Sequence, residues 1–333
     1  MSLEFRAVKK RWGNFSLDMD FRVEDGETLV LAGMSGCGKT TALTIIAGLV
    51  APDEGTVLIG GRDMSGVPSW KRGVSLVFQD LALFPHLDTA GNVAYGPFIR
   101  GVPGRRRAEI VREQLEAVHL PGFGARKIAT LSGGERQRAA IARALAASPR
   151  ALLLDEPFSS LDAPLRRRLR REFRELLKAA DFPSVFVTHD QEEAAAIADR
   201  IAFVQAGRIV ESGPPEAVFL EPKTRSGAEF FGAGTVLPCS VLIPRDAVLL
   251  SPGPRTVPLP ARLQSVFFEG RERSLEFAVS LPGRTGPVIL RTSLSSRAPC
   301  PPEGSETTVW IAVDLLRYCA DNVPAVCGVL PPG

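Results

Sequence analysis

The stretch Gly33-Met34-Ser35-Gly36-Cys37-Gly38-Lys39-Thr40-Thr41 decides the fold of this chain. It fits the pattern G-x-x-x-x-G-K-[ST], follows the apolar run 29–32 and precedes a segment with apolar residues at helical spacing. The glycines let successive backbone N–H groups point into one concavity, and the start of the helix adds positive potential. We therefore predict a phosphate site, in which Lys39 reaches the β- and γ-phosphates of a nucleotide and the Thr40 hydroxyl ligates Mg²⁺.

Most of this loop is expected to contact the nucleotide, and Cys37 is expected to do so through its backbone alone. The alternative is a glycine-rich turn without a ligand, which the strand before it and the helix after it disfavour. The predicted nucleotide-binding residues of the loop are Gly33, Ser35, Gly36, Cys37, Gly38, Lys39, Thr40 and Thr41.

A second element is the apolar run 151–154, followed directly by Asp155 and Glu156. Four apolar residues predict a buried central strand, which delivers both carboxylates to the carboxyl end of a sheet, where ligands bind in open α/β folds. We expect Asp155 to hold Mg²⁺ and Glu156 to polarise an attacking water. Strands that end in acidic residues are common, so this element indicates a nucleotide site only in combination with the phosphate loop.

Length and composition limit the class of protein. A chain of 333 residues indicates two domains, and a net charge of +3 is too small to indicate nucleic acid as a partner. No apolar run is long enough for a membrane helix, and the N-terminus lacks the pattern of a secretory signal. The five cysteines contain no Cys-x-x-Cys pair, so neither a disulfide framework nor a zinc site is expected. These features favour a cytoplasmic protein.

The composition changes near residue 235, because 14 of the 27 prolines come after residue 234. Before that point, short apolar strands alternate with amphipathic helices, which predicts an α/β domain with a largely parallel sheet. After it, alternating strands with Pro- and Gly-rich turns predict a small β-barrel or sandwich. The predicted strands are 29–32, 74–78, 151–154, 184–188, 261–269, 274–281, 288–292 and 308–313, and the predicted helices are 109–118, 135–147 and 165–180.

The stretch Leu131-Ser132-Gly133-Gly134 lies about 20 residues before the acidic strand. Here the chain resembles the ATP-binding subunits of ABC transporters, in which Leu-Ser-Gly-Gly is the signature motif. The resemblance implies that Ser132, Gly133 and Gly134 close over the γ-phosphate of ATP bound to the opposite subunit, so that two chains meet head to tail. By itself, Ser-Gly-Gly is more often the turn that starts a helix, where it also forms an anion-binding surface. A simple kinase with a phosphate loop is disfavoured, since it has no use for the signature.

Other elements of the same family follow in the expected order. The resemblance assigns Gln79 to the Q-loop, touching Mg²⁺ or the attacking water, and Asp162, in Ser159-Ser160-Leu161-Asp162, to the D-loop at the dimer seam. It makes His189 the switch histidine, which contacts the γ-phosphate beside Glu156. Trp12 stands where the family places an aromatic ring on adenine, with core packing as the alternative.

The segment 80–87 after Gln79 resembles part of the groove for the permease coupling helix, with an ordinary packing turn as the alternative. Two basic runs, 105–107 and 166–171, raise the possibility of lipid or nucleic acid as a ligand. The second run lies on the polar face of a predicted helix, so a solvated face is expected there. Residues 243–250 resemble a divergent motif of the TOBE domains that end many importer ATPases, although Ile243 and Arg245 depart from that motif.

The expected architecture is an ABC ATPase cassette over residues 1–234, with a helical subdomain at about 82–147, and a β-rich TOBE-like domain over 235–333. The resemblance implies an ATP-hydrolysing importer subunit that uses ATP and Mg²⁺. It is expected to act as a homodimer with two membrane permeases and a solute-binding protein, at the cytoplasmic face of the membrane. Inorganic ions such as ferric iron, molybdate or tungstate are the expected cargo, with polyamines or oligosaccharides as alternatives. A soluble ABC ATPase without a transport role, and a regulatory role for the tail, are the remaining alternatives.

Overall fold

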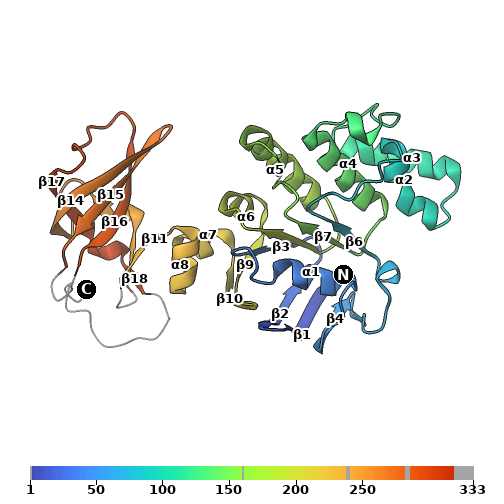
Figure 1. Ribbon diagram of the computed structural model, residues 1–333, viewed down its shortest axis with the longest axis horizontal. Helices are drawn as coiled ribbons and strands as arrows, with labels where there is room; N and C mark the ends of the chain where they lie inside the picture. The colour runs from blue at the N-terminus through green and yellow to red at the C-terminus, as the bar shows by residue number, and fades with distance from the viewer. Residues whose placement is uncertain (1, 160, 238–240, 282–285, 319–333) are drawn as a thin grey trace. The chain divides into compact units, whose positions relative to one another are not determined.

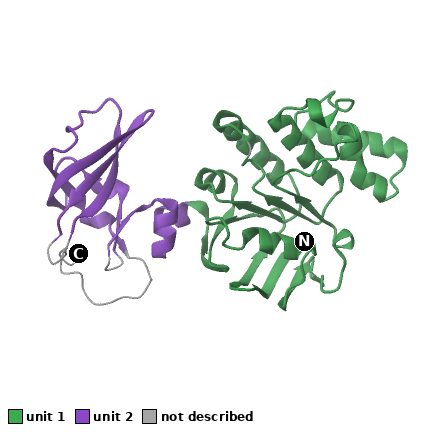
Figure 2. Ribbon diagram, viewed as in Figure 1, with its two compact units in different colours: residues 1–215 green, residues 216–333 purple. Residues whose placement is uncertain are grey.

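The computed structural model describes residues 2–159, 161–237, 241–281 and 286–318. The chain divides into two compact units, residues 1–215 and 216–333 (Figures 1 and 2). The boundary predicted at 234/235 lies inside the second unit, at the start of a strand, and that assignment of domains stays a prediction.

The first unit is built on a six-stranded sheet in the order β10-β9-β3-β8-β7-β6. Its strands run parallel except for β10, which pairs antiparallel with β9. Every residue of β3, β7 and β8 is buried, as expected for strands covered on both faces of a parallel sheet. The six strands are β3 (Thr28–Ala32), β6 (Val74–Val77), β7 (Ala151–Asp155), β8 (Ser184–Thr188), β9 (Arg200–Gln205) and β10 (Arg208–Gly213).

A second, antiparallel sheet in the same unit has the order β2-β1-β4-β5 and was not predicted from the sequence. Helix α1 (Lys39–Ala47) shares one apolar core with both sheets, through residues such as Leu43, Ile45 and Ile46 (Figure 1). The phosphate loop is therefore anchored at the centre of the unit. The four strands are β1 (Leu3–Trp12), β2 (Phe15–Val23), β4 (Glu54–Ile59) and β5 (Arg62–Asp63).

Three helices, α2 (Thr89–Ile99), α3 (Gly104–Ala117) and α4 (Gly133–Ala146), stand between β6 and β7 in the chain and pack on one another, in agreement with the predicted helical segment. Helix α5 (Ala163–Lys178) follows β7, and the short α6 (Gln191–Ile197) follows β8. The predicted α/β fold with a helical insertion is confirmed.

The second unit begins within α7 (Pro215–Leu220) and continues through α8 (Arg225–Phe231); its other described elements are antiparallel strands and two short 3-10 helices. Buried and exposed residues alternate along β14, so that one face of the strand lines the core. The two sheets of this unit share that core, and the Thr235 hydroxyl joins them by donating to the carbonyl of Ile289 at 2.8 Å. The predicted all-β C-terminal domain is confirmed. The sheets are β11-β12-β18 (Gly234–Val236, Val241–Pro244, Arg317–Tyr318) and β13-β17-β14-β15-β16 (Val248–Leu249, Glu306–Ala312, Thr256–Glu269, Glu272–Val279, Val288–Ser295).

Candidate active site

Four neighbouring parallel strands, β3, β8, β7 and β6, end at one edge of the large sheet. Ligands of open parallel sheets bind outside this edge. The glycine-rich loop 33–38 follows β3, Gln79 follows β6, Glu156 follows β7 and His189 follows β8. The fold thus brings together four predicted site segments that lie far apart in the sequence.

The shape of the loop depends on two of its glycines. Gly33 has φ 157°, and a Cβ there would lie 2.3 Å from the carbonyl oxygen of Val204. Gly38 has φ 108°, and a Cβ there would lie 2.8 Å from Cζ of Phe15. Because α1 starts directly after Gly38, the backbone N–H groups of its first turn have no partner inside the helix and can bind an anion.

The ammonium group of Lys39 lies within this loop. Its side chain is buried, and Nζ donates to the carbonyl oxygens of Gly33 at 2.8 Å and Met34 at 2.9 Å. A buried charge needs such polar partners. The positive charge is therefore held where the phosphates of a nucleotide are expected.

Thr40 and Asp155 meet at the floor of the site, where the threonine hydroxyl donates to Oδ1 of the aspartate at 3.0 Å. Burial raises the pKa of the Asp155 carboxyl, the Thr40 hydrogen bond acts against this shift, and the charge of Glu156 adds to it. A hydroxyl, a carboxylate and the amide of Gln79 are the hard oxygen donors that Mg²⁺ prefers. The residues present therefore fit the magnesium site predicted from the sequence.

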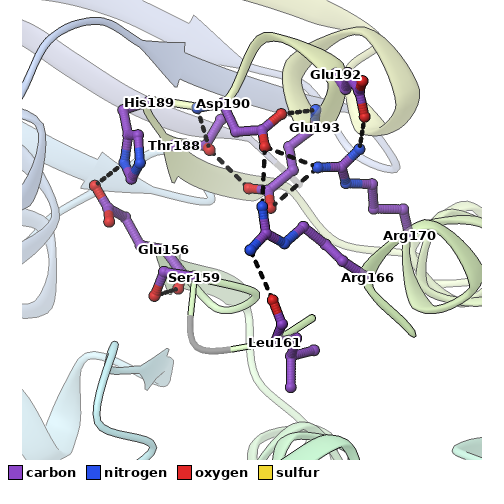
Figure 3. A network of polar contacts seen from close by, with 10 residues as sticks. All are labelled: Glu156, Ser159, Leu161, Arg166, Arg170, Thr188, His189, Asp190, Glu192 and Glu193. Atoms are coloured by element: carbon purple, nitrogen blue, oxygen red, sulfur yellow. Dashed lines mark hydrogen bonds and ion pairs between the residues drawn. The ribbon is translucent and has the colours of Figure 1, made fainter. Parts of the chain in front are cut away.

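Glu156 and His189 are in direct contact, with 2.9 Å between Oε1 of the glutamate and Nδ1 of the imidazole (Figure 3). Glu156 has φ 43°, a left-handed conformation that costs a non-glycine residue about 1–3 kcal/mol. Its backbone N–H donates to the carbonyl of Val187 at 3.0 Å, and its carbonyl accepts from the Ser159 hydroxyl at 2.9 Å. These contacts fix the backbone at the turn and direct the carboxylate toward His189.

One open pocket joins the loop to Gln79 and Glu156, two of the catalytic residues predicted on other strands, while His189 is not among the residues that line it. Gln79 is also tied to the turn after β7, since its Nε2 lies 3.5 Å from the Ser159 hydroxyl. The pocket is lined by Phe15, Ser35, Gly36, Gly38, Lys39, Thr40, Thr41, Gln79 and Glu156.

The aromatic residue that lines this pocket is Phe15, which the sequence did not single out. Trp12, the predicted partner of adenine, pairs with Phe15 across the β1–β2 hairpin and is 45% exposed. The Lys10 ammonium lies 5.5 Å from the centre of its ring. Stacking of Trp12 on a base stays a prediction.

The signature residues lie elsewhere, at the start of α4, and are not among the residues that line the described pocket. Ser132 caps the helix: its hydroxyl accepts from the Glu135 N–H at 3.3 Å, and its own N–H donates to the Glu135 carboxylate at 2.7 Å. The hydrogen bonds from the Ser132 backbone and side chain lower the pKa of Glu135. At Gly134 a Cβ would lie 2.8 Å from Leu165, so glycine allows α4 to approach α5 closely. Local structure thus accounts for Ser132 and Gly134 without a nucleotide.

The D-loop leads into α5, where the Asp162 carboxylate caps the helix by accepting from the Leu165 N–H at 3.0 Å. Ser160, the second residue of that motif, lies outside the described residues. The role of Asp162 at a dimer seam stays a prediction.

The segment after Gln79 has two consecutive non-glycine residues in the left-handed region, Leu81 (φ 64°) and Ala82 (φ 43°). Arg143 of α4 donates to both of their carbonyls, at 2.8 Å and 2.5 Å. The ring of Phe84 packs 4.5 Å from that of Tyr95, which is 40% exposed. The helical segment and the Q-loop are therefore held together by one arginine that the sequence did not point to.

The basic run 166–171 differs in part from its prediction. Arg167, Arg168 and Arg171 are exposed, as expected for a solvated face, but Arg170 is 4% exposed. Its guanidinium is paired with carboxylates from the segment after β8. The expected solvated face is therefore wrong for Arg170 alone among these four, because an arginine that finds acidic partners can be buried.

Comparison with known proteins adds independent information. Residues 17–159 match the family model described as ABC transporter. The Fe(3+) ions import ATP-binding protein FbpC 1 of Rhizobium meliloti (strain 1021) is 46% identical over 243 residues, which is 72% of this chain and 69% of that protein. The chain belongs to the ABC transporter family.

Other relatives of this ABC protein carry similar names. The Fe(3+) ions import ATP-binding protein FbpC of Agrobacterium fabrum is 46% identical over 72% of this chain and 69% of the relative. The spermidine/putrescine import ATP-binding protein PotA of Oleidesulfovibrio alaskensis is 41% identical over 80% of this chain and 72% of the relative. The resemblance drawn from the sequence is confirmed: this is an ATP-binding and ATP-hydrolysing subunit of the importer type. In the described part of the chain, no helix has the length and apolar composition needed to span a bilayer.

Proposed function

We propose that this ABC ATPase drives the uptake of ferric ions, with Glu156 as the base for hydrolysis. The contact between Glu156 and His189, beside the phosphate loop, carries the catalytic part of the proposal. The cargo rests on the relatives named for Fe(3+) import, which are 46% identical, whereas the relative named for polyamine import is 41% identical. Because a relative named for polyamine import is also similar, but less so, polyamine import is the second candidate.

In the proposed mechanism, Lys39 and the N–H groups at the start of α1 bind the β- and γ-phosphates of ATP. Thr40, Asp155 and Gln79 would hold Mg²⁺, which would supply positive charge to stabilise the reacting phosphate. Glu156 orients a water molecule and accepts its proton, while Nδ1 of His189 holds the carboxylate and the other ring nitrogen faces the γ-phosphate. Charge arranged in advance around the reacting phosphate provides much of the rate enhancement in such sites.

The signature residues require a second copy of the chain in this proposal. Within one chain, Ser132, Gly133 and Gly134 stand at the start of α4, while the described pocket is lined by residues from other elements. A helix start capped by serine still presents backbone N–H groups of its first turn. In a head-to-tail homodimer, these groups of one protomer cover the γ-phosphate bound by its partner, and Asp162 lies at the seam.

Two membrane permeases and a solute-binding protein complete the proposed importer, and the ATPase is peripheral at the cytoplasmic face. The segment 80–87 supports a contact with a permease, because its Phe84 packs on Tyr95 of α2, which is 40% exposed, and the two rings provide an apolar surface after Gln79. No nucleic acid is involved. Residues 235–333 act as an accessory domain, although Ile243, where related motifs have arginine, is buried in the apolar core.

Reconstitution with the permease and the binding protein tests this function. Proteoliposomes that contain the complete importer, with ATP inside, are expected to hydrolyse ATP faster and to accumulate radioactive ferric ion when the binding protein is loaded. Accumulation of spermidine or putrescine in place of iron would favour the second candidate. ATP hydrolysis that never responds to any permease would contradict a transport role.

A further inference from the structure

One arginine of α5 contacts two of the functional loops at once. Nη2 of Arg166 donates to the backbone carbonyl of Leu161 in the D-loop at 2.7 Å (Figure 3). Nη1 of the same guanidinium lies 3.3 Å from Oδ2 of Asp190, the residue that follows His189. The two loops come from different strands, and Arg166 joins them directly.

Asp190 is itself held firmly. Its Oδ2 also accepts from Arg170 at 2.9 Å, and its Oδ1 accepts from the backbone N–H of Glu193 at 3.0 Å at the start of α6. Arg170 is 4% exposed, and a charge buried to this extent is stable only with partners. The Asp190 carboxylate is therefore held in one position, and so is the guanidinium of Arg166 that pairs with it.

His189 stands between two anchored neighbours. On one side is Asp190; on the other, the Thr188 hydroxyl donates to the Glu193 carboxylate at 2.6 Å and accepts from the Asp190 N–H at 2.9 Å. Side-chain contacts thus hold the backbone on both sides of His189, and the imidazole itself contacts the carboxylate of Glu156. Figure 3 shows this network on one side of His189 and Glu156 on the other.

We propose that Arg166 is a positioning residue for hydrolysis, which holds the D-loop at Leu161 in register with the turn that carries His189. The inference rests on the proposed function, because it assumes that Glu156 and His189 act on ATP. A charged hydrogen bond to a carbonyl and an ion pair are stronger than neutral contacts, and both are made by one rigid, planar group. A movement of the D-loop therefore reaches the Glu156–His189 pair through Arg166.

Steady-state ATP hydrolysis by Arg166→Ala tests the kinetic side. Small displacements of a catalytic group can reduce rates by up to about a hundredfold, so we expect kcat to fall by about tenfold or more while KM for ATP stays within about twofold. Arg166→Lys is expected to recover only part of the rate, because one ammonium does not match the two-pronged geometry. The matched control is Arg168→Ala on the same helix, whose exposed side chain pairs with Glu172 at 2.9 Å and touches neither loop.

The NMR signals of the His189 imidazole provide a second measurement, which would not change if Arg166 only stabilised the fold. The sequence has three histidines, so His189→Gln assigns its ¹H–¹⁵N imidazole signals by difference. We expect Arg166→Ala to shift these signals and Arg168→Ala to leave them unchanged. Asp190→Asn, which can still cap α6, is expected to lower kcat in the same way, and the double variant to lose little more.

The outcomes separate this inference from the proposed function. A wild-type protein that hydrolyses no ATP would overturn the proposed function, while the imidazole signals would still report on Arg166. An active wild type, with kcat and His189 signals of Arg166→Ala equal to those of Arg168→Ala, would overturn the inference alone. Additive losses in Arg166→Ala and Asp190→Asn would also overturn it, because they would show that the two residues act independently.

Discussion

Nδ1 of His189 lies 2.9 Å from Oε1 of Glu156, and the two residues follow adjacent parallel strands, β8 and β7. The contact fixes one nitrogen of the imidazole on the carboxylate and leaves the other available to a substrate. It forms between residues 33 positions apart, because the sheet aligns the ends of its strands. The chemistry proposed for this protein depends on that alignment.

Glu156→Gln is expected to bind ATP normally and to reduce hydrolysis by a hundredfold or more, since an amide accepts a proton poorly. Light scattering at saturating ATP is expected to show a stable dimer, because the nucleotide is trapped between protomers. Lys39→Ala, which removes the charge from the loop, serves as the control that should stay monomeric. A Glu156→Gln protein that remains monomeric with ATP would count against the two-chain site.

Gly38→Ala is expected to abolish ATP binding. The new methyl group would meet Phe15, and alanine at φ 108° costs on the order of 1–3 kcal/mol. Gly61→Ala is the matched control: Gly61 also has a positive φ (73°), but its Cβ would meet nothing within 4 Å, and it lies between β4 and β5, away from the loop. Fluorescent nucleotide titration should show binding in the control and none in Gly38→Ala; equal affinity in both would mean that the loop tolerates the change.

Arg143→Ala is expected to destabilise the protein by about 2 kcal/mol, because two hydrogen bonds from a charged group to the carbonyls of Leu81 and Ala82 are lost. These two residues remain in the left-handed region without support. Adding Ala82→Gly should recover part of the loss, since glycine adopts this conformation without strain. Urea denaturation measures both effects, and a double variant no more stable than Arg143→Ala would show that the strain is not released there.

Glu193 makes stability depend on pH. Burial is the largest cause of the raised pKa of this carboxyl; the Thr188 hydrogen bond opposes it, and the charge of Asp190 adds to it. A carboxyl whose pKa is raised on folding stabilises the native state fully below its unfolded pKa, and this contribution is lost as pH rises through the folded pKa. Glu193→Gln should therefore gain stability relative to wild type between pH 5 and pH 8. Denaturation at both values checks this, and a constant difference would contradict it.

Cysteines introduced at Ser35 and Ser132 test the head-to-tail arrangement. With nucleotide, the pair is expected to form a disulfide between separate chains, visible as a dimer on a non-reducing gel. Either single variant is the control, and it should give no such band once the native cysteines, Cys37 of the loop above all, are replaced in all three variants. If the double variant forms no crosslink at any nucleotide concentration, the signature of one chain does not lie near the phosphate loop of another, and the head-to-tail arrangement is contradicted.

The motifs of this site could be predicted because each is local and each stands at the end of a strand. The loop 33–38 and the Glu156 turn follow buried apolar runs that are unmistakable in the sequence. The antiparallel sheet β1-β2-β4-β5 was missed, because β1 and β2 mix buried and exposed residues, and β1 contains an irregularity between Phe5 and Val8. Phe15, which lines the pocket and lies next to Gly38, belongs to that sheet.

Contacts between distant polar side chains were the other part that the sequence did not reveal. Arg170 stands in a run of arginines that resembles an exposed face, and only the acidic residues after β8 explain its burial. Arg143 likewise binds carbonyls 61 and 62 positions away. Such pairings depend on how helices pack against loops, and residue type and spacing do not predict this packing.

Helix α4 has 14 residues and is therefore about 20 Å long. Its first residues are those proposed to cover the neighbour's ATP, and Arg143, near its other end, grips the segment proposed to face the permease. The helix thus connects the proposed nucleotide contact at its first residues with the segment that Arg143 holds near its last. In the proposed dimer, ATP bound to one protomer would meet the start of α4 in the other, and a displacement of this helix would reach the segment that Arg143 holds.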